Sequence, residues 1–230
     1  MTDHILTEFD NDLKGLHELL ASMSAHVEEQ MRETEQLLKD PHLELVDSVL
    51  AKATNVNRME IRIDRTCARI LARHHPLASD LRTIITAQKV IADIERIGDE
   101  CERIAKSVND RLEEGFDAGQ MPDNLVGLAG LVSQSVRGSI DSYLRVDTDG
   151  ARQVISGDQA IDECYAEILG QISERLKKSE AGVEAVAMEW LWVVRSLERI
   201  GDHSCNVAEY AIYLDEGKDV RHKGKLNPGD

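Results

Sequence analysis

Two pairs of acidic residues have the same spacing and the same neighbours. Glu95 and Asp99 lie four residues apart in the string IERIGD, and Glu198 and Asp202 lie four apart in LERIGD. Residues four apart share one face of an α-helix, one turn above each other. Like charges at this spacing destabilise an isolated helix by roughly a few tenths of a kcal/mol. We therefore expect a cation or a partner group to compensate each pair.

The arginine inside each string is a poor candidate for that cation. Arg96 and Arg199 follow the glutamates directly, so they point about 100° away around the helix and are not expected to sit between both carboxylates. A partner helix or a metal ion is the favoured alternative. Asp158 and Asp162 form a third pair with the same spacing, which an antiparallel neighbour could bring opposite the second string. Four carboxylates would then form an all-oxygen site suited to Mg, Ca, Mn or Fe.

Other chemical motifs are absent or weak. A solvated helix face explains any single acidic pair, although two copies within one repeated string make that explanation weaker. No glutamate stands three residues before a histidine, so the ligand pattern of di-iron bundles is missing. Neither a P-loop, a GxSxG elbow nor an HExxH helix occurs. His74, His75 and His203 are interpreted as structural residues rather than ligands, with His74 and His75 solvated or capping a helix end.

Long helices must position these residues. The chain has 230 residues, of which 42% are apolar and only 3% aromatic, with four prolines, so little material is available for sheets. Apolar residues recur at spacings of three and four, which is typical of amphipathic helices. Prolines and glycines separate the periodic segments. The pattern predicts helices over residues 5–39, 43–72, 77–112, 123–146, 148–177 and 183–214.

The chain is built from two similar halves. The second acidic string repeats the first 103 positions later, with five of six letters identical, and a segment rich in glycine and proline lies midway. The sequence therefore predicts an all-α fold of two tandem, pseudo-symmetric three-helix bundles. The expected boundaries are 1–114 for the first repeat, 115–122 for the linker, 123–215 for the second repeat and 216–230 for a flexible tail.

Charge and composition restrict the partners. The formal net charge of −16 disfavours nucleic-acid binding and favours metal cations or basic protein surfaces. No apolar run reaches the roughly 18 residues of a membrane span, and the N-terminus has no signal-peptide pattern. The four cysteines are scattered singly, which suits reduced thiols. We expect a cytoplasmic protein without disulfides, which meets the membrane only through its partners.

The chain resembles the PhoU family of bacterial phosphate-uptake regulators. The resemblance covers nearly the whole chain and rests on the doubled ERIGD, on PLASDLR at residues 76–82, on NVNRME at residues 55–60, and on Gly157, Asp158 and Asp162. It implies a non-enzymatic negative regulator of phosphate uptake and phosphate-starvation signalling. The implied partners are the ATPase of the phosphate ABC transporter and the phosphate sensor histidine kinase, and a homodimer is expected.

The resemblance also implies metal clusters on the acidic motifs, with divalent or ferric ions (Fe, Mn, Mg, Ca or Zn). The ligands carried over to this chain are Glu95, Asp99, Asp158, Asp162, Glu198 and Asp202. One departure concerns the first repeat, where Ala53 and Asn57 stand at the positions that correspond to Asp158 and Asp162. The first site therefore has fewer carboxylates, and we expect it to bind metal less tightly.

Two alternatives remain open. The acidic cluster could serve a carboxylate-bridged hydrolase or oxidase, which would need an open coordination position and a general base. The missing Glu-x-x-His pattern argues against the oxidase. Alternatively, the protein could be a helical scaffold without metal, and metal analysis of the purified protein would separate that case from the other two.

Overall fold

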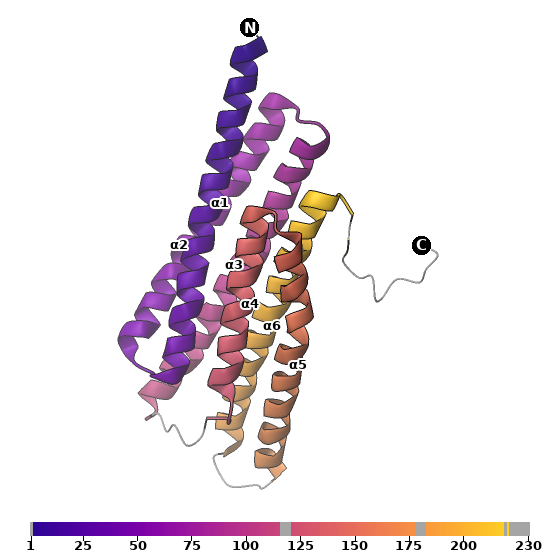
Figure 1. Ribbon diagram of the computed structural model, residues 1–230. Helices are drawn as coiled ribbons and strands as arrows, with labels where there is room; N and C mark the ends of the chain where they lie inside the picture. The colour runs from indigo at the N-terminus through magenta and orange to yellow at the C-terminus, as the bar shows by residue number, and fades with distance from the viewer. Residues whose placement is uncertain (1, 116–120, 178–182, 219, 221–230) are drawn as a thin grey trace.

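The computed structural model describes residues 2–115, 121–177, 183–218 and 220, and its described residues form six helices and no strand (Figure 1). Every helix begins and ends within three residues of its predicted limits. The helices are α1 (Thr2–Lys39), α2 (Leu43–His74), α3 (Ala78–Glu113), α4 (Leu125–Arg145), α5 (Thr148–Lys177) and α6 (Val183–Glu216). The middle of the predicted linker and most of the predicted tail lie outside the described residues. Glu216 closes α6, although the sequence had placed it in the tail.

Tight connections make successive helices antiparallel. The α2–α3 turn contains His75 in the left-handed conformation, with φ of 48°, directly before Pro76. Proline cannot continue the helical hydrogen-bond ladder, so α2 ends there. Val146 has φ of 55° in the still shorter α4–α5 turn, where the Asp147 backbone N–H bonds the Ser142 carbonyl.

The two halves form two three-helix bundles that pack against each other. In the first, α2 packs on α1 and α3; in the second, α5 packs on α4 and α6. The bundles meet mainly where α3 lies against α6 and α1 against α4 (Figure 1). The α3–α6 pair is antiparallel, since Arg111 near the end of α3 bonds Glu189 near the start of α6, and Lys89 lies over Tyr210.

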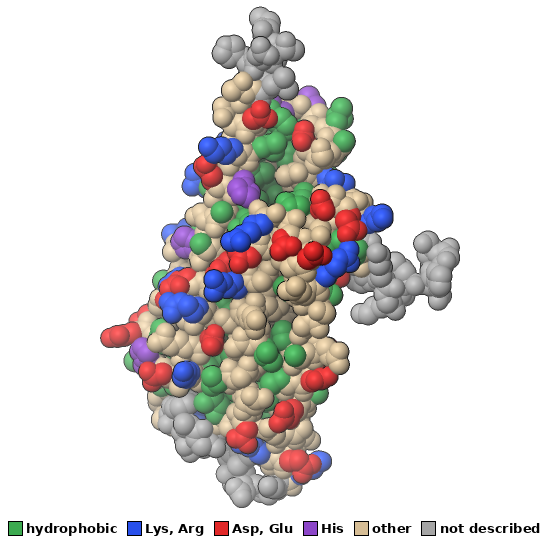
Figure 2. Space-filling view, in the orientation of Figure 1, with side chains coloured by type: hydrophobic (Ala, Val, Ile, Leu, Met, Phe, Trp, Pro, Cys, Tyr) green, Lys and Arg blue, Asp and Glu red, His purple; other side chains and the backbone are tan. Residues whose placement is uncertain are grey.

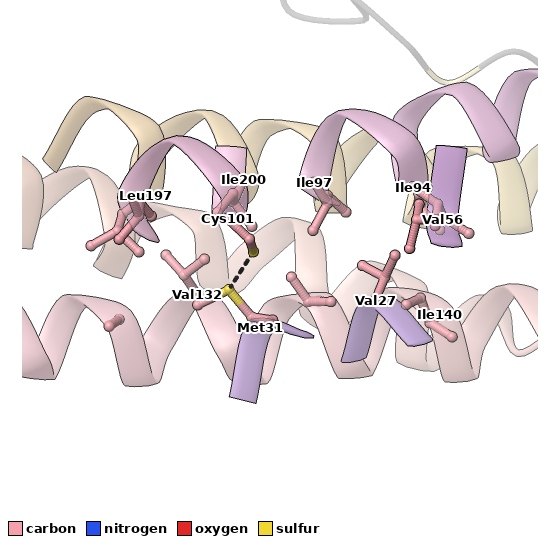
Figure 3. Packing of buried hydrophobic residues seen from close by; sticks show 14 of the residues in the cluster. Val27, Met31, Val56, Ile94, Ile97, Cys101, Val132, Ile140, Leu197 and Ile200 are labelled. Atoms are coloured by element: carbon pink, nitrogen blue, oxygen red, sulfur yellow. Dashed lines mark hydrogen bonds between the residues drawn. The ribbon is translucent and has the colours of Figure 1, made fainter. Parts of the chain in front are cut away.

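A single apolar core runs through both bundles. Figure 3 shows its centre, where side chains from five helices interdigitate and the Cys101 thiol points to the Met31 sulfur at 3.7 Å. Its labelled residues are Val27, Met31, Val56, Ile94, Ile97, Cys101, Val132, Ile140, Leu197 and Ile200. Because core positions on α3 and α6 contact both bundles, these two helices hold the acidic strings in a fixed relation to the other elements.

No described helix combines the length and the apolar character that crossing a bilayer requires. All four cysteines are free thiols, of which Cys67, Cys101 and Cys164 are buried and Cys205 is partly buried.

Candidate metal centres

The second-repeat site lies between α5 and α6. Gly201 of the ERIGD string faces Ile161 of α5, and a Cβ added at Gly201 would lie 3.3 Å from that side chain and 3.6 Å from Asp158 Oδ1. The glycine therefore lets the two helices approach closely. This approach brings Asp158 and Asp162 of α5 into the electrostatic field of the acidic pair on α6, as the sequence predicted.

The carboxylates of this site repel one another. Burial raises the pKa of Asp158, the charges of Asp162 and Asp202 raise it as well, and only a hydrogen bond from Cys205 lowers it. Burial also raises the pKa of Glu198, as do Asp202 and Asp162, against the lowering effect of Arg195 and Arg199. A cation at this place would relieve both penalties.

Cys205 adds a sulfur to the edge of this site. It lies one helical turn beyond Asp202 and donates its hydrogen bond to Asp158. Burial raises the pKa of the Cys205 thiol, and the neighbouring charges of Asp158, Asp202 and Glu209 raise it further. The thiol therefore stays protonated and serves as a donor to the carboxylate.

The first-repeat site includes Glu95 and Asp99 of α3, whose side chains are 23% and 22% exposed. Arg96 contacts both, with Nε 3.6 Å from Glu95 Oε2 and Nη1 3.5 Å from Asp99 Oδ2. The expectation that Arg96 could not reach both carboxylates was therefore wrong. The direction of the Cα–Cβ bond differs by about 100°, but the long arginine side chain curls back along the helix surface and spans the distance.

Two further oxygen donors come from α2. The charge of Glu60 acts on Glu95, whose pKa is raised first by burial and then by Asp99, with Glu60 adding to the effect and Arg96 and His203 opposing it. Asn57 Oδ1 is buried and has no hydrogen-bond partner among the described residues. An orphaned buried carbonyl oxygen is costly unless a donor or a cation meets it.

The two sites correspond to each other through the internal repeat. A Cβ at Gly98 would meet Val56 of α2 at 3.4 Å, just as one at Gly201 meets Ile161 of α5. The positions on α2 and α5 that face the glycines therefore differ by 105. The same offset pairs Ala53 with Asp158 and Asn57 with Asp162, so the structure supports the correspondence that the sequence suggested.

A pair of polar contacts joins the two repeats between the sites. Asp93 of α3 accepts hydrogen bonds from His203 Nδ1 at 2.7 Å and Asn206 Nδ2 at 3.0 Å, both on α6. At the symmetry-related place, the buried Glu100 of α3 accepts one from Ser196 Oγ at 2.8 Å. Glu100 also bonds Arg103 at 2.6 Å and Arg199 at 3.0 Å. The aspartate contact gives His203 a structural role, as expected.

The other histidines differ from the expectation in part. The His74 side chain is not solvated, since it is 6% exposed and its Nε2 lies 2.9 Å from Asp12 Oδ2 on α1. His75 caps α2 through its backbone N–H, which bonds the Leu71 carbonyl. His74 therefore ties α2 to α1, at the end of α2 and 17 residues beyond Asn57.

The chemistry of the donor set fits a hard metal ion. The second site offers four carboxylates, and the first offers three carboxylates and an amide oxygen, which are the ligands that Mg, Ca, Mn and Fe accept. Within the described ranges, no three acidic, histidine or cysteine side chains yet surround one point at ligand distance. Asp162 and Asp202 are exposed and Asp158 and Glu198 are half-buried, so ion binding at the second site requires rotamer changes that bring these carboxylates together.

Sequence reasoning placed Asn57 at the first site only as the counterpart of Asp162, and it did not assign Glu60 or Cys205 to either site. Helical spacing could have identified them, because Glu60 lies three residues after Asn57 and Cys205 three after Asp202, each on the same helix face. The missing information was the register between neighbouring helices, which the two close-approach glycines fix only in the folded chain.

Comparison with known proteins agrees with this arrangement. The family model of the PhoU domain matches twice, over residues 20–108 and 125–211, one match for each three-helix bundle. The repeat that was inferred from the acidic strings is therefore a repeat of this domain.

Similar proteins align along nearly the whole chain. A PhoU homolog from Pseudomonas aeruginosa is 37% identical over 97% of this chain and 92% of its own. The PhoU protein of Escherichia coli is 30% identical at the same coverage, and both are described as accessory proteins of the phosphate-specific transport system.

Solved structures show the same fold. The crystal structure of PhoU from Pseudomonas aeruginosa superposes with a TM-score of 0.84 at 33% identity, covering 91% of this chain and all of the other. That of the phosphate transport regulatory protein PhoU from Streptococcus pneumoniae gives 0.81 at 26% identity, covering 92% and 99%. With two domain matches, full-length relatives and a shared fold, the chain belongs to the PhoU family.

Proposed function

We propose that this protein is a negative regulator of phosphate uptake and phosphate-starvation signalling. It acts in the cytoplasm, as a homodimer, by contacting the ATPase of the phosphate ABC transporter and the phosphate sensor histidine kinase. The observation that carries the proposal is the double match to the PhoU domain, since the similar proteins are named accessory proteins of the phosphate-specific transport system.

Metal ions have a structural part in this proposal. Asp158, Asp162, Glu198 and Asp202 would hold divalent or ferric ions (Fe, Mn, Mg, Ca or Zn) in the second repeat. Asn57, Glu60, Glu95 and Asp99 would do so in the first. Bound ions supply positive charge. The protein residues provide oxygen ligands from two helices at each site, so that α5 is fixed to α6 and α2 to α3.

The surface charge supports contacts with basic patches on partners. Acidic side chains are spread along the length of the face shown in Figure 2, with basic side chains among them. A chain of net charge −16 is attracted toward positive surfaces. Such complexes weaken as the Debye length falls from about 10 Å at 0.1 M salt to about 3 Å at 1 M. Reversible binding with strong salt dependence is therefore the expected behaviour.

Co-purification tests the adaptor role. Tagged protein should retain the transporter ATPase or the sensor kinase from cell extracts at low salt and release it at high salt. Extracts from phosphate-rich and phosphate-starved cells should differ in the amount retained. Failure to retain either partner under both growth conditions would contradict the adaptor role.

A catalytic assay tests the competing hydrolase. The purified, metal-loaded protein should hydrolyse neither phosphoesters nor ATP at enzyme-like rates. Turnover that disappears in Asp202→Ala, while an exposed-carboxylate control such as Glu163→Ala keeps it, would replace the regulator by a metal-dependent hydrolase.

A further inference from the structure

Helix α2 carries an exposed row of arginines that the acidic sites do not use. Arg58, Arg62, Arg65 and Arg69 are spaced by four, three and four residues, so they follow one helix face. All four are exposed, and none forms an ion pair with a carboxylate in the described part of the chain. Neighbouring like charges on a helix repel each other. Asp12 and Glu18 of α1 line a hollow together with Arg62 and Arg69, but neither forms an ion pair with these arginines in the described part of the chain.

The arginines border a groove between α1 and α2. The groove has a volume of about 320 Å³, and besides the arginines it is lined by Leu19 of α1 and Thr66 of α2. Ile61, which is 48% exposed, lies at its edge. A second hollow of about 310 Å³ continues it along α1, past Asp12 and Glu18. The surface therefore combines an apolar strip with a row of guanidinium groups.

The fold itself does not require this charge. The offset of 105 relates α2 to α5. At this offset Arg58 corresponds to Glu163, Arg62 to Glu167 and Arg69 to Glu174. Both helices occupy equivalent outer positions in their bundles. The positive face is thus particular to the first repeat, and opposite in sign to its counterpart.

We propose that the α1–α2 groove docks an acidic helix of a partner protein. Four arginines from Arg58 to Arg69 extend over about 17 Å, or three helical turns, and match carboxylates spaced at i, i+4, i+7 and i+11 on a partner helix. Arginine binds carboxylates through two parallel hydrogen bonds, and it is enriched with apolar residues at the centres of protein interfaces. This docking surface goes beyond the regulatory role proposed above and holds whichever partner supplies the helix.

The shape and the total charge favour a protein helix over other anions. A concave groove lined by Leu19 and Ile61 as well as by arginines accepts a convex, amphipathic ligand, whereas a bilayer surface is flat on this scale. A membrane or a nucleic-acid duplex would also bring extended negative charge close to the rest of a chain at −16. A short helix seated over Arg58, Ile61 and Arg65 places its carboxylates against the arginine row, away from Asp12 and Glu18 in the adjoining hollow.

A synthetic peptide provides the direct test. The probe is a fluorescein-labelled helix of about 18 residues with glutamates at the matching positions and leucines beside them. Its fluorescence anisotropy is measured with the full-length protein at about 0.05 M salt. We expect the double variant Arg62→Gln/Arg65→Gln to bind at least about tenfold more weakly than the wild type. A peptide of the same composition with the glutamates off register should bind at least about fivefold more weakly.

The matched control removes the same charge elsewhere. Arg32→Gln/Arg145→Gln changes two exposed arginines that have their own carboxylate partners, Glu29 and Asp141, and should bind the peptide within about twofold of the wild type. If Arg62→Gln/Arg65→Gln did not fold, as judged by circular dichroism, Arg62→Lys/Arg65→Lys would replace it. That variant keeps the charge but loses the paired hydrogen bonds, so it should still weaken binding.

Three results would overturn the proposal. The first is equal peptide affinity for the groove and control variants, and the second is no measurable peptide binding by the wild type. The third is groove-dependent binding only to vesicles of phosphatidylglycerol and phosphatidylcholine, or only to a DNA duplex, which would assign the arginines to a lipid surface or to nucleic acid.

Discussion

At the scale of single residues, the acidic motifs are held partly exposed and under mutual repulsion. The pKa values of Glu95, Asp158 and Glu198 are all raised, first by burial and then by a neighbouring carboxylate. A chain gains nothing in stability from such an arrangement without a compensating cation. The repulsion is therefore the physical reason for proposing metal at both places.

The two sites should differ in metal affinity. The second has four carboxylates, whereas the first has Asn57 and Ala53 at two of the corresponding positions. The Asp158→Ala/Asp202→Ala variant should lose most of the bound metal, and Glu95→Ala/Asp99→Ala should lose less. Elemental analysis by mass spectrometry of protein purified without chelator measures both.

The control for metal loss is Glu163→Ala/Glu167→Ala, which removes two exposed carboxylates from α5 outside the site. It should keep the metal content of the wild type. Equal losses in the two site variants, or a metal-free wild type, would contradict the predicted difference.

The acidic pairs were identifiable from sequence because a four-residue spacing fixes a shared helix face, and their role as metal ligands stays a prediction. Glu60 and the thiol of Cys205 were not identifiable, because their approach to the site depends on the register of the neighbouring helix. The reach of Arg96 to both Glu95 and Asp99 was also missed, since helical geometry fixes the direction of a Cβ but not the path of a long side chain.

At the scale of helices, the glycine of each acidic string controls how closely two helices pack. Gly201→Leu should force α5 away from α6, because even a Cβ there meets Ile161 at 3.3 Å. We expect a loss of about 1–3 kcal/mol in the free energy of unfolding, as is typical of overpacked cores. Urea denaturation followed by circular dichroism gives this value.

Gly170→Leu is the matched substitution on the exposed side of α5, where an added Cβ has no atom within 4 Å. It should be neutral or stabilising by up to about 1 kcal/mol, since leucine favours helix over glycine. A similar loss in both variants would mean that the close approach at Gly201 does not limit the packing.

A carboxylate between the two bundles makes stability depend on pH. Burial raises the pKa of Glu28 on α1, and Asp141 of α4 raises it further against the effect of Arg137. Because the folded-state pKa lies above the unfolded value near 4.5, stability falls as the pH rises through the folded-state pKa. Glu28→Gln should therefore melt at a higher temperature than the wild type near pH 7, and the difference should vanish near pH 4.

Scanning calorimetry of Glu28→Gln at several pH values checks this dependence. Glu18→Gln, which changes an exposed glutamate on the same helix, serves as the control and should not show the pH-dependent difference. A Glu28→Gln variant less stable than the wild type near neutral pH would reverse the sign and contradict the account.

Helix limits were predictable to within a few residues because Pro41, Pro76 and Pro122 interrupt the apolar periodicity. The geometry of the turns was less predictable. His75, Asn124 and Val146 adopt positive φ angles that glycine would favour, and neither His75 nor Val146 signals this by its type. Short connections between packed helices impose the angles of His75 and Val146, so these follow from the tertiary structure.

At the scale of the whole molecule, the repeat was evident in sequence but its packing was not. The doubled string predicts two similar bundles. No motif in either helix, however, predicts that α3 packs against α6 along its length. The polar contacts of Asp93 and Glu100 with α6 lie at symmetry-related places within that interface. That these contacts join the two repeats follows only from the packing of α3 against α6 in the folded chain.

The shared core predicts that the two repeats unfold together. Buried residues from both bundles form one cluster, so neither bundle keeps its apolar surface covered without the other. Calorimetry of the metal-free protein should give a single transition whose calorimetric and van't Hoff enthalpies agree. Two resolved transitions would show that the bundles are separate cooperative units.

The proposed function requires this protein to turn off the phosphate-starvation response when phosphate is abundant. The most direct measurement is a reporter fused to a phosphate-responsive promoter, followed in rich phosphate in a strain that lacks the protein. We expect the reporter to stay on in this strain and the wild-type chain, supplied in trans, to turn it off. Normal repression in the strain without the protein would contradict the proposed function.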